Sequence, residues 1–253
     1  MTLTTHPFLD HGLSILHARL QDKAQAGRAG QEAGAHPFVT ISREAGAGAT
    51  TLGRLLVPRL NERLREPDGH SWVFLDKDLL THALTRHHLP ERLAEYLPED
   101  RVSEIKGVIG ELVGLHPSLW QLEHQVAEAI LQLAHVGHVI FAGRASHLIT
   151  RPLPGGFHVR LVASMPARIQ RMLALLNCDA RAAAAHIDKS DLARRRYVRT
   201  NFDEDIDDPH TYDLVINTDH LSPGCTARIV VDALCDRISR FSDVGAGSTV
   251  TEA

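Results

Sequence analysis

A glycine-containing loop between a predicted strand and a predicted helix constrains this chain more than any other feature of its sequence. Residues 38–41 are apolar and rich in β-branched side chains, as in a buried strand, and leucines from residue 52 onward indicate a helix. Between them, Gly46 and Gly48 allow the backbone to turn tightly and to approach a ligand closely. Such a loop gathers free backbone N–H groups and the positive end of a helix dipole around one point. The segment is therefore predicted to bind an anion.

The loop departs from the strict phosphate-binding pattern GxxxxGK[ST]. Aligning Gly48 and Thr50 with that pattern puts Arg43 at the first glycine and Ala49 at the lysine. Because the customary lysine is absent, Arg43 is our candidate for the missing positive charge. We expect loop amides to cradle phosphates and the Thr50 hydroxyl to ligate Mg²⁺. A degenerate glycine-rich turn without a ligand is the alternative. The predicted cradle comprises Gly46, Ala47, Gly48, Ala49, Thr50 and Thr51.

Strand and helix patterns alternate along the middle of the chain, which is typical of an α/β fold with a mostly parallel sheet. We expect a central sheet of about five strands in three layers, and a single domain over residues 37–242. Within it, residues 79–136 are predicted to be a helical insertion and residues 179–210 a lid. The predicted strands cover residues 38–41, 72–75, 138–142, 157–163 and 212–217.

Both ends of the chain differ from this pattern. Residues 1–36 combine a short helix, which carries a narrow seam of leucines, with a connection rich in glycine and alanine. That seam is a candidate surface for a partner protein or a second copy of the chain. Residues 243–253 are predicted to be a disordered tail.

Composition narrows the classes of function. Hydrophobic residues make up 43% and charged residues 23%, as in ordinary globular proteins, and no apolar run approaches the roughly 20 residues that span a bilayer. A net charge of −4 argues against nucleic acid as a partner. The three cysteines form no metal-binding pair and fit reduced thiols. We expect a cytoplasmic protein that does not bind membranes.

Charged side chains follow two more predicted strands. Asp76 follows the strand predicted over residues 72–75, and Arg144 follows Gly143 at the end of the next strand. In parallel sheets, the carboxyl ends of the strands line the ligand crevice. An arginine there suits bidentate phosphate recognition, and a carboxylate there can orient an acceptor group. A helix cap at Asp76 and a surface ion pair at Arg144 are the alternatives.

A basic segment lies at residues 187–199, which read IDKSDLARRRYVR. Asp191 and Arg194 are three positions apart and share a helix face. Cations there would stabilise the negative charge that spreads over a phosphoryl group during transfer. A solvated basic helix or a contact with RNA backbone is the alternative. The candidate cations of this segment are Arg194, Arg195 and Arg199.

Taken in order, these segments resemble the cytidylate kinases, and more closely the cytidylate kinase-like group of P-loop nucleoside monophosphate kinases. The resemblance runs from about Phe38 to Leu234. It is carried by ISREAGAGATTLGRLL, VIFAGR, HVRLVASMPARIQRM, DKSDLARRRYV and YDLVINTDHLS. It implies a P-loop fold and phosphoryl transfer from ATP with Mg²⁺ to a pyrimidine nucleoside monophosphate, with a lid that excludes water.

The resemblance also implies roles for single residues. Asp76 would sit beside the acceptor phosphate, and Arg144 would grip that phosphate. Asp188, Asp191 and Arg194 match the lid pattern Asp-x-x-Asp-x-x-Arg and are implied to bind substrate. The chain departs from true cytidylate kinases at Ala49, Ala145 and Ile187, where they carry lysine, an acid and arginine, and these departures fit the cytidylate kinase-like group better.

Three functions follow from this interpretation. The first is an ATP-dependent nucleoside monophosphate kinase that uses the residues named above, with Arg43, Asp76, Arg194, Arg195 and Arg199 in catalysis. The second is a nucleotide-binding regulatory protein that has lost efficient turnover, which Ala49 favours. The third is a kinase for another small acceptor.

Overall fold

Five parallel strands form the central sheet, and they confirm the α/β class predicted from the sequence. The computed structural model describes residues 36–64, 71–76, 105, 108–109 and 121–246. Each of the five predicted strands is present within a few residues of its expected bounds. They are β1 (Phe38–Arg43), β2 (Val73–Asp76), β3 (Val139–Ala142), β4 (Gly156–Val162) and β5 (Leu214–Asn217).

The strand order is β2-β3-β1-β4-β5, so β1 lies in the middle of the sheet. After β1 the chain visits β2 and β3 on one side and then β4 and β5 on the other side. In sheets of this kind, ligands bind outside the carboxyl ends of the strands where the order reverses. The loop after β1 therefore lies at the position that the topology favours for a ligand.

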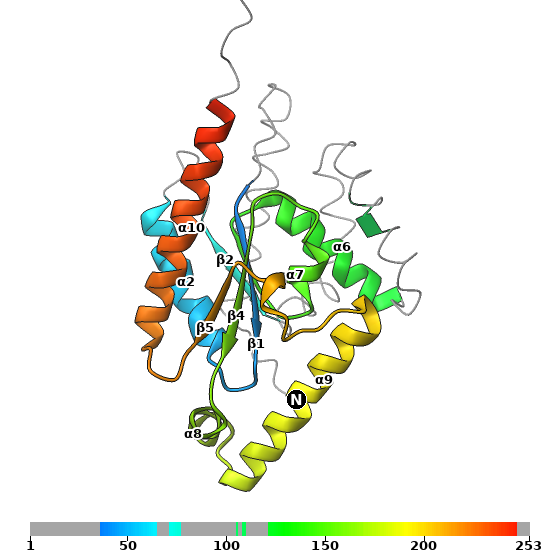
Figure 1. The fold of residues 1–253 in the computed structure, drawn as a ribbon, viewed down its shortest axis with the longest axis vertical. Helices are drawn as coiled ribbons and strands as arrows, with labels where there is room; N and C mark the ends of the chain where they lie inside the picture. The colour runs from blue at the N-terminus through cyan, green and yellow to red at the C-terminus, as the bar shows by residue number, and fades with distance from the viewer. Residues whose placement is uncertain (1–35, 65–70, 77–104, 106–107, 110–120, 247–253) are drawn as a thin grey trace, which may run out of the picture.

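Helices cover both faces of the sheet (Figure 1). On one face, α2 packs against α10, and the other face is covered by α6 and α7. Two further helices, α8 and α9, pack on each other beyond the carboxyl ends of the strands. The helices are α2 (Ala49–Arg63), α6 (Gln121–Val136), α7 (Ser146–Ile149), α8 (Met165–Leu176), α9 (Ala180–Phe202) and α10 (Pro223–Ala246), with a short 3-10 turn at Pro209–Thr211.

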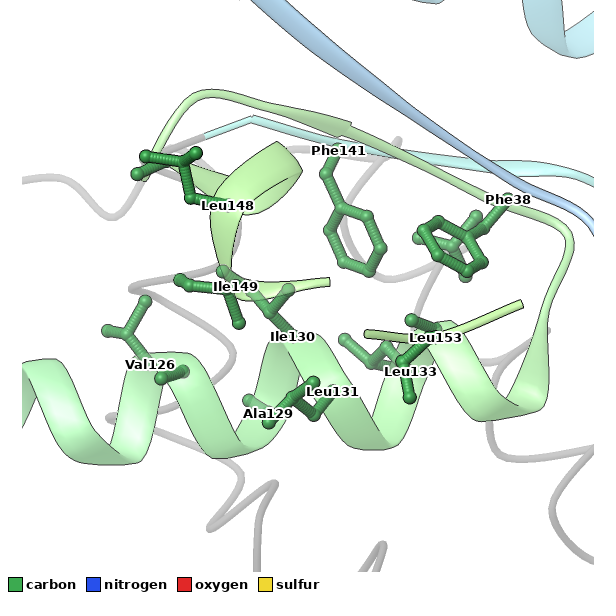
Figure 2. Close-up of a cluster of buried hydrophobic side chains, with 14 of the residues drawn as sticks. Phe38, Val126, Ala129, Ile130, Leu131, Leu133, Phe141, Leu148, Ile149 and Leu153 are labelled. Carbon is green, nitrogen blue, oxygen red and sulfur yellow. The ribbon is translucent and has the colours of Figure 1, made fainter. Parts of the chain in front are cut away.

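Alternating side chains of β1 feed two separate apolar cores. Phe38 joins the core under α6 and α7, where Figure 2 shows it beside Phe141 and above the α6 leucines. Val39 and Ile41 join the core under α2 and α10. Both faces of β1 are buried, so the polar Thr40 and Ser42 are buried together with the apolar side chains of the strand.

Helix ends largely follow their sequence signals. Ser164 caps α8 by accepting a hydrogen bond from the Ala167 N–H (3.4 Å), and Ser222 accepts one from the Cys225 N–H (3.2 Å) before α10. Pro58 lies inside α2, which continues past it to Arg63 although proline usually kinks or ends a helix. Helix α10 extends to Ala246, beyond the start that the sequence predicts for the tail.

The remaining segment predictions lie mostly outside the described residues. This holds for the helix and connection of residues 1–35, for most of the insertion over 79–136 and for the end of the tail. The domain boundaries stay predictions. Among the helices of the described part, none is both long and apolar enough to cross a bilayer.

A buried histidine, His147, and a half-buried one, His158, lie in a polar part of the sheet face that α7 covers. His147 stacks on Tyr212 with the ring centroids 4.7 Å apart, and His158 Nδ1 lies 2.8 Å from the Thr40 hydroxyl oxygen. Burial, with smaller contributions from nearby His158 and arginine charges, lowers the pKa of His147 to about 3. Burial also lowers the pKa of His158 to about 4, although Asp213 opposes this effect. Both side chains are therefore neutral in the native protein at neutral pH.

We expect the free energy of unfolding to fall as the pH drops below about 6.5, the ordinary histidine pKa. In that range the unfolded chain takes up protons that the folded chain does not, so protonation favours unfolding. For His147 alone the loss between about pH 7 and about pH 5 is roughly 2 kcal/mol. His147→Phe keeps an aromatic ring on Tyr212 and removes the titration, so urea denaturation across this range should show a flatter profile. The same slope as wild type would refute this origin, and His186→Phe, at an exposed site on α9, is the control.

Candidate functional site

The loop between β1 and α2 contains two residues in the left-handed region of backbone space. Gly46 has φ 80° and Gly48 has φ 95°, values that side chains other than glycine rarely adopt. A Cβ atom added to Gly46 would lie 2.9 Å from the backbone oxygen of Arg168, so this glycine also lets the loop pack directly on α8. An atom added to Gly48 would meet nothing within 4 Å. The loop is thus closed against α8 at Gly46 and open at Gly48.

Hydrogen bonds on the outside of the loop fix the direction of its peptide groups. The Arg171 guanidinium donates to the Gly46 carbonyl (3.2 Å), and the Thr218 hydroxyl donates to the Ala47 carbonyl (3.2 Å). Arg171 also donates to the hydroxyl and the carbonyl of Thr218, at 2.9 and 2.6 Å. Because the C=O and N–H of one peptide point in opposite directions, a carbonyl held on the outside turns the following N–H inward. Arg171 and Thr218 therefore orient the Gly48 N–H toward the inside of the loop.

Several of the predicted cradle amides have no hydrogen-bond acceptor among the described residues. The first α2 hydrogen bond runs from the Leu52 N–H to the Gly48 carbonyl (2.9 Å), so the N–H groups of residues 49–51 precede it. No side chain caps this helix start and no acidic residue lies in its first turn. The Ala47 N–H is different, because it donates to the Glu44 carbonyl (3.2 Å) within the loop. The amides available to an anion in this part of the chain are those of Gly48, Ala49, Thr50 and Thr51, with Gly46 at the loop entrance.

The ends of β2 and β3 bring the next predicted residues together. Asp76 and Arg144 line one narrow recess with Gly143, next to the centre of the sheet. The Arg43 guanidinium also reaches this strand end, since a Cβ atom added to Gly143 would lie 2.0 Å from Arg43 Nη1. Gly143, Arg144 and Ala145 all have positive φ, of 91°, 57° and 50°. This consecutive left-handed backbone is strained for the two side-chain-bearing residues, and such strain is concentrated at functional sites.

The Asp191 carboxylate connects α9 to the loop and to α8. Its Oδ1 accepts from the Ala45 N–H (2.8 Å) and from Arg194 (2.8 Å), and its Oδ2 accepts from Arg168. Asp191 and Arg168 are both 7% exposed. Arg168 also lies 3.7 Å from the Glu44 carboxylate, which in turn accepts from the Ala163 N–H (2.9 Å). This buried network of charges holds α9 beside the loop.

The other predicted residues of α9 are arranged along the helix away from this network. Arg195 pairs with Asp207 (2.9 Å), which also pairs with the buried Arg160, and the Asp207 hydrogen bond is the main cause that raises the Arg195 pKa. Arg199 is 68% exposed and lies 3.6 Å from Asp203. Asp188 is exposed on α9 and takes no part in the Asp191 contacts. The structure therefore brings Asp191 and Arg194 to the loop, but not Arg199.

Four residues of this site were not singled out by the sequence analysis. Glu44 lies inside the glycine-containing loop, and Thr218 directly follows β5. Arg168 and Arg171 lie on the helix after β4. All four follow the carboxyl ends of strands, which is the same position that drew attention to Asp76 and Arg144. That positional signal could have found them.

Comparison with known proteins adds the family. The model of the cytidylate kinase-like family matches residues 38–220, which include the loop, the strand ends and the Asp191 network. The chain belongs to the cytidylate kinase-like family. Membership supports nucleotide kinase activity in general terms, without fixing the acceptor.

Individual relatives of this cytidylate kinase-like chain are distant. A protein named cytidylate kinase from Pyrobaculum aerophilum is 29% identical over 119 residues, which are 47% of this chain and 64% of that protein. The chain thus matches less than two thirds of that relative's length. An uncharacterized protein from Eubacterium ventriosum superposes with a TM-score of 0.55 at 17% identity, over 79% of this chain and 99% of that one, and it shares the fold. Shikimate kinase from Bacteroides thetaiotaomicron gives a TM-score of 0.43 at 16% identity, over 80% and 98%.

Proposed function

We propose that the chain transfers a phosphoryl group from ATP with Mg²⁺ to a pyrimidine nucleoside monophosphate. The observation that carries this proposal is the open loop at the centre of the sheet, whose inward amides sit at an uncapped helix start. Membership in the cytidylate kinase-like family supports a nucleotide as the ligand. The choice of a pyrimidine monophosphate as the acceptor is the finer part of this proposal, and the sequence resemblance favours it.

The donor phosphates would bind at the loop. The amides of Gly48 and residues 49–51 donate to phosphate oxygens, and the α2 dipole favours the negative charge there. The Thr50 side chain is exposed at the first turn of α2, where its hydroxyl is able to ligate Mg²⁺. When bound, Mg²⁺ supplies positive charge to the phosphate oxygens. Arg171 and Thr218 keep the loop in its binding conformation from the outside.

The acceptor would bind at the ends of β2 and β3. Arg144 holds its phosphate through a bidentate fork, and Asp76, which lines the same recess, orients the acceptor. Arg43 lies between the loop and this recess, at Gly143, where its charge can act on the phosphoryl group in transit. Arg194 reaches the loop from α9 and adds a second cation. Arg195 would have to leave Asp207 in order to act on the phosphates. In-line transfer between the two sites needs no covalent enzyme intermediate.

Steady-state assays of ADP formation with a panel of nucleoside monophosphates test this proposal. We expect CMP or UMP to stimulate ATP consumption, and Arg144→Ala to lower kcat/KM by about a hundredfold because the acceptor loses a bidentate contact. Arg151→Ala removes a nearby arginine that is 50% exposed and paired with Glu204, and should leave the rate within twofold. Stimulation by purine monophosphates alone, or equal losses in the two variants, would contradict the assignment.

A nucleotide-binding regulatory protein is the second candidate. It is favoured by Ala49 in place of the lysine and by Arg194, whose guanidinium is already paired with Asp191. Calorimetry with ATP and Mg²⁺ on wild type and Arg43→Ala separates the two. Binding of ATP without turnover of any monophosphate supports the regulator, and we expect weaker binding in Arg43→Ala if its guanidinium replaces the lysine.

A further inference from the structure

A groove between α2 and α10 lies on the face of the sheet that these helices cover. It encloses about 500 Å³. Arg59 lies ten residues after Ala49, which corresponds to about 15 Å along a helix, so the groove is separate from the phosphate loop. The groove is lined by Arg59, Glu62, Arg63, Gly224, Arg228 and Val231.

The lining of the groove carries a net positive charge. Its lining holds three arginines and one glutamate, and none of the three arginines forms an ion pair within the described part of the chain. This differs from arginines elsewhere in the structure, such as Arg160 and Arg237, which each pair with an aspartate. Clustered guanidinium groups repel one another when no anion lies between them.

Backbone contacts place one of these arginines, Arg59, at the groove. Arg59 donates through Nη1 to the Leu55 carbonyl (3.0 Å) on its own helix. A Cβ atom added to Gly224 would lie 3.7 Å from Arg59 Nη2, so the guanidinium stands directly over the start of α10. Glycine at this position leaves room beside the guanidinium that a side chain would fill.

The thiols near the groove do not neutralise its positive charge. Arg228 Nη2 lies 3.7 Å from the Cys225 sulfur, and the Arg63 side chain hydrogen-bonds to the Cys235 thiol. Burial raises the pKa of Cys235, and the contact with Arg63 only partly opposes this effect. Cys235 is therefore a neutral thiol at neutral pH, and the charge on Arg63 remains available.

We propose that this groove is a second binding site, which takes a small phosphorylated molecule between Arg59, Arg63 and Arg228. Guanidinium groups bind phosphate oxygens in pairs, and three of them around one groove match the several oxygens of a phosphoryl group. The volume is in the range of small-molecule sites. An anion held here would join α2, which begins at the phosphate loop, to α10. The site stands independently of the kinase function proposed above.

Calorimetric titration of the full chain with inorganic pyrophosphate, without Mg²⁺, tests this site. We expect the double variant Arg59→Ala/Arg228→Ala to lose one equivalent of bound pyrophosphate, with affinity at that site at least about tenfold weaker. Binding at the phosphate loop should remain in this variant. Failure of the kinase assays would therefore not affect the result.

The matched control is Arg151→Ala/Arg240→Ala, which removes the same charge from arginines that are 50% and 78% exposed and ion-paired. It should bind the same number of pyrophosphate molecules as wild type. Unchanged binding in the groove variant, or an equal loss in the control, would overturn the proposal. Tighter binding of citrate than of pyrophosphate would overturn the assignment to phosphates.

Discussion

Replacing Gly46 with alanine is expected to abolish ATP binding and to lower the free energy of unfolding by about 2–4 kcal/mol. Two effects add at this position. Its φ of 80° is strained for any residue with a Cβ atom, and the new methyl group would lie 2.9 Å from the backbone oxygen of Arg168. Backbone cannot rotate away as a side chain can, so α8 and the loop must separate. That separation also breaks the Arg171 contact that holds the Gly46 carbonyl outward.

The control for this prediction is Gly48→Ala. Gly48 has φ 95°, so alanine meets the same kind of strain, but an added Cβ atom has no neighbour within 4 Å. We expect a loss of only about 1 kcal/mol in stability. Urea denaturation measures both variants, and calorimetry measures their affinity for ATP. Equal losses of stability in the two variants would show that packing of the loop on α8 contributes nothing.

The sheet and the loop were predictable because their signals are local. Residues 38–42 are buried, and the apolar or β-branched side chains of residues 38–41 indicate a central strand without knowledge of its neighbours. The two glycines that follow mark the turn. Likewise, Asp76 and Arg144 were predicted to meet only because the carboxyl ends of parallel strands share one edge. Each of these steps needs the sequence within one strand and the geometry of parallel pairing.

The buried ion pair of Asp191 and Arg168 beside the loop was not predictable in the same way. The Ala45 N–H and the Asp191 carboxylate are 146 positions apart, and nothing in either segment specifies the other. From its sequence, Arg168 is an ordinary polar position of α8, whose burial depends on how α8 and α9 pack on each other. The resemblance implied a substrate-binding role for Asp191 because this residue matches a sequence pattern. Such a pattern does not show which donors already form hydrogen bonds to the carboxylate.

The contacts of Asp191 favour a positioning role. A carboxylate accepts about four hydrogen bonds, and three donors already approach this one from α8, α9 and the loop. Arg168 balances its charge in a site where water is excluded. If Arg194 turned toward a bound phosphate, Arg168 would still compensate the carboxylate, so α9 would stay attached to the loop. Substrate binding by Asp191 remains a prediction that its variants can test.

Asp191→Ala is therefore expected to destabilise the fold by about 3–5 kcal/mol, which is the usual loss when one partner of a buried ion pair is removed. The Arg168 guanidinium would keep only the more distant Glu44, at 3.7 Å, and the Ala45 N–H would lose its acceptor. Asp191→Asn retains an acceptor for Ala45 and should recover part of the loss. Chemical denaturation of the full chain measures both variants without requiring an active enzyme.

Asp188→Ala separates positioning from substrate binding, because Asp188 lies on the same helix, one turn earlier, with an exposed side chain. Its removal should change stability by less than about 0.5 kcal/mol. If the role implied by the resemblance holds for Asp188, the variant raises KM for the monophosphate while the fold is unaffected. A loss of stability as large as that of Asp191→Ala would contradict the buried network as the origin. A stable Asp191→Ala protein with a raised KM for the monophosphate would instead support a substrate-binding role for Asp191.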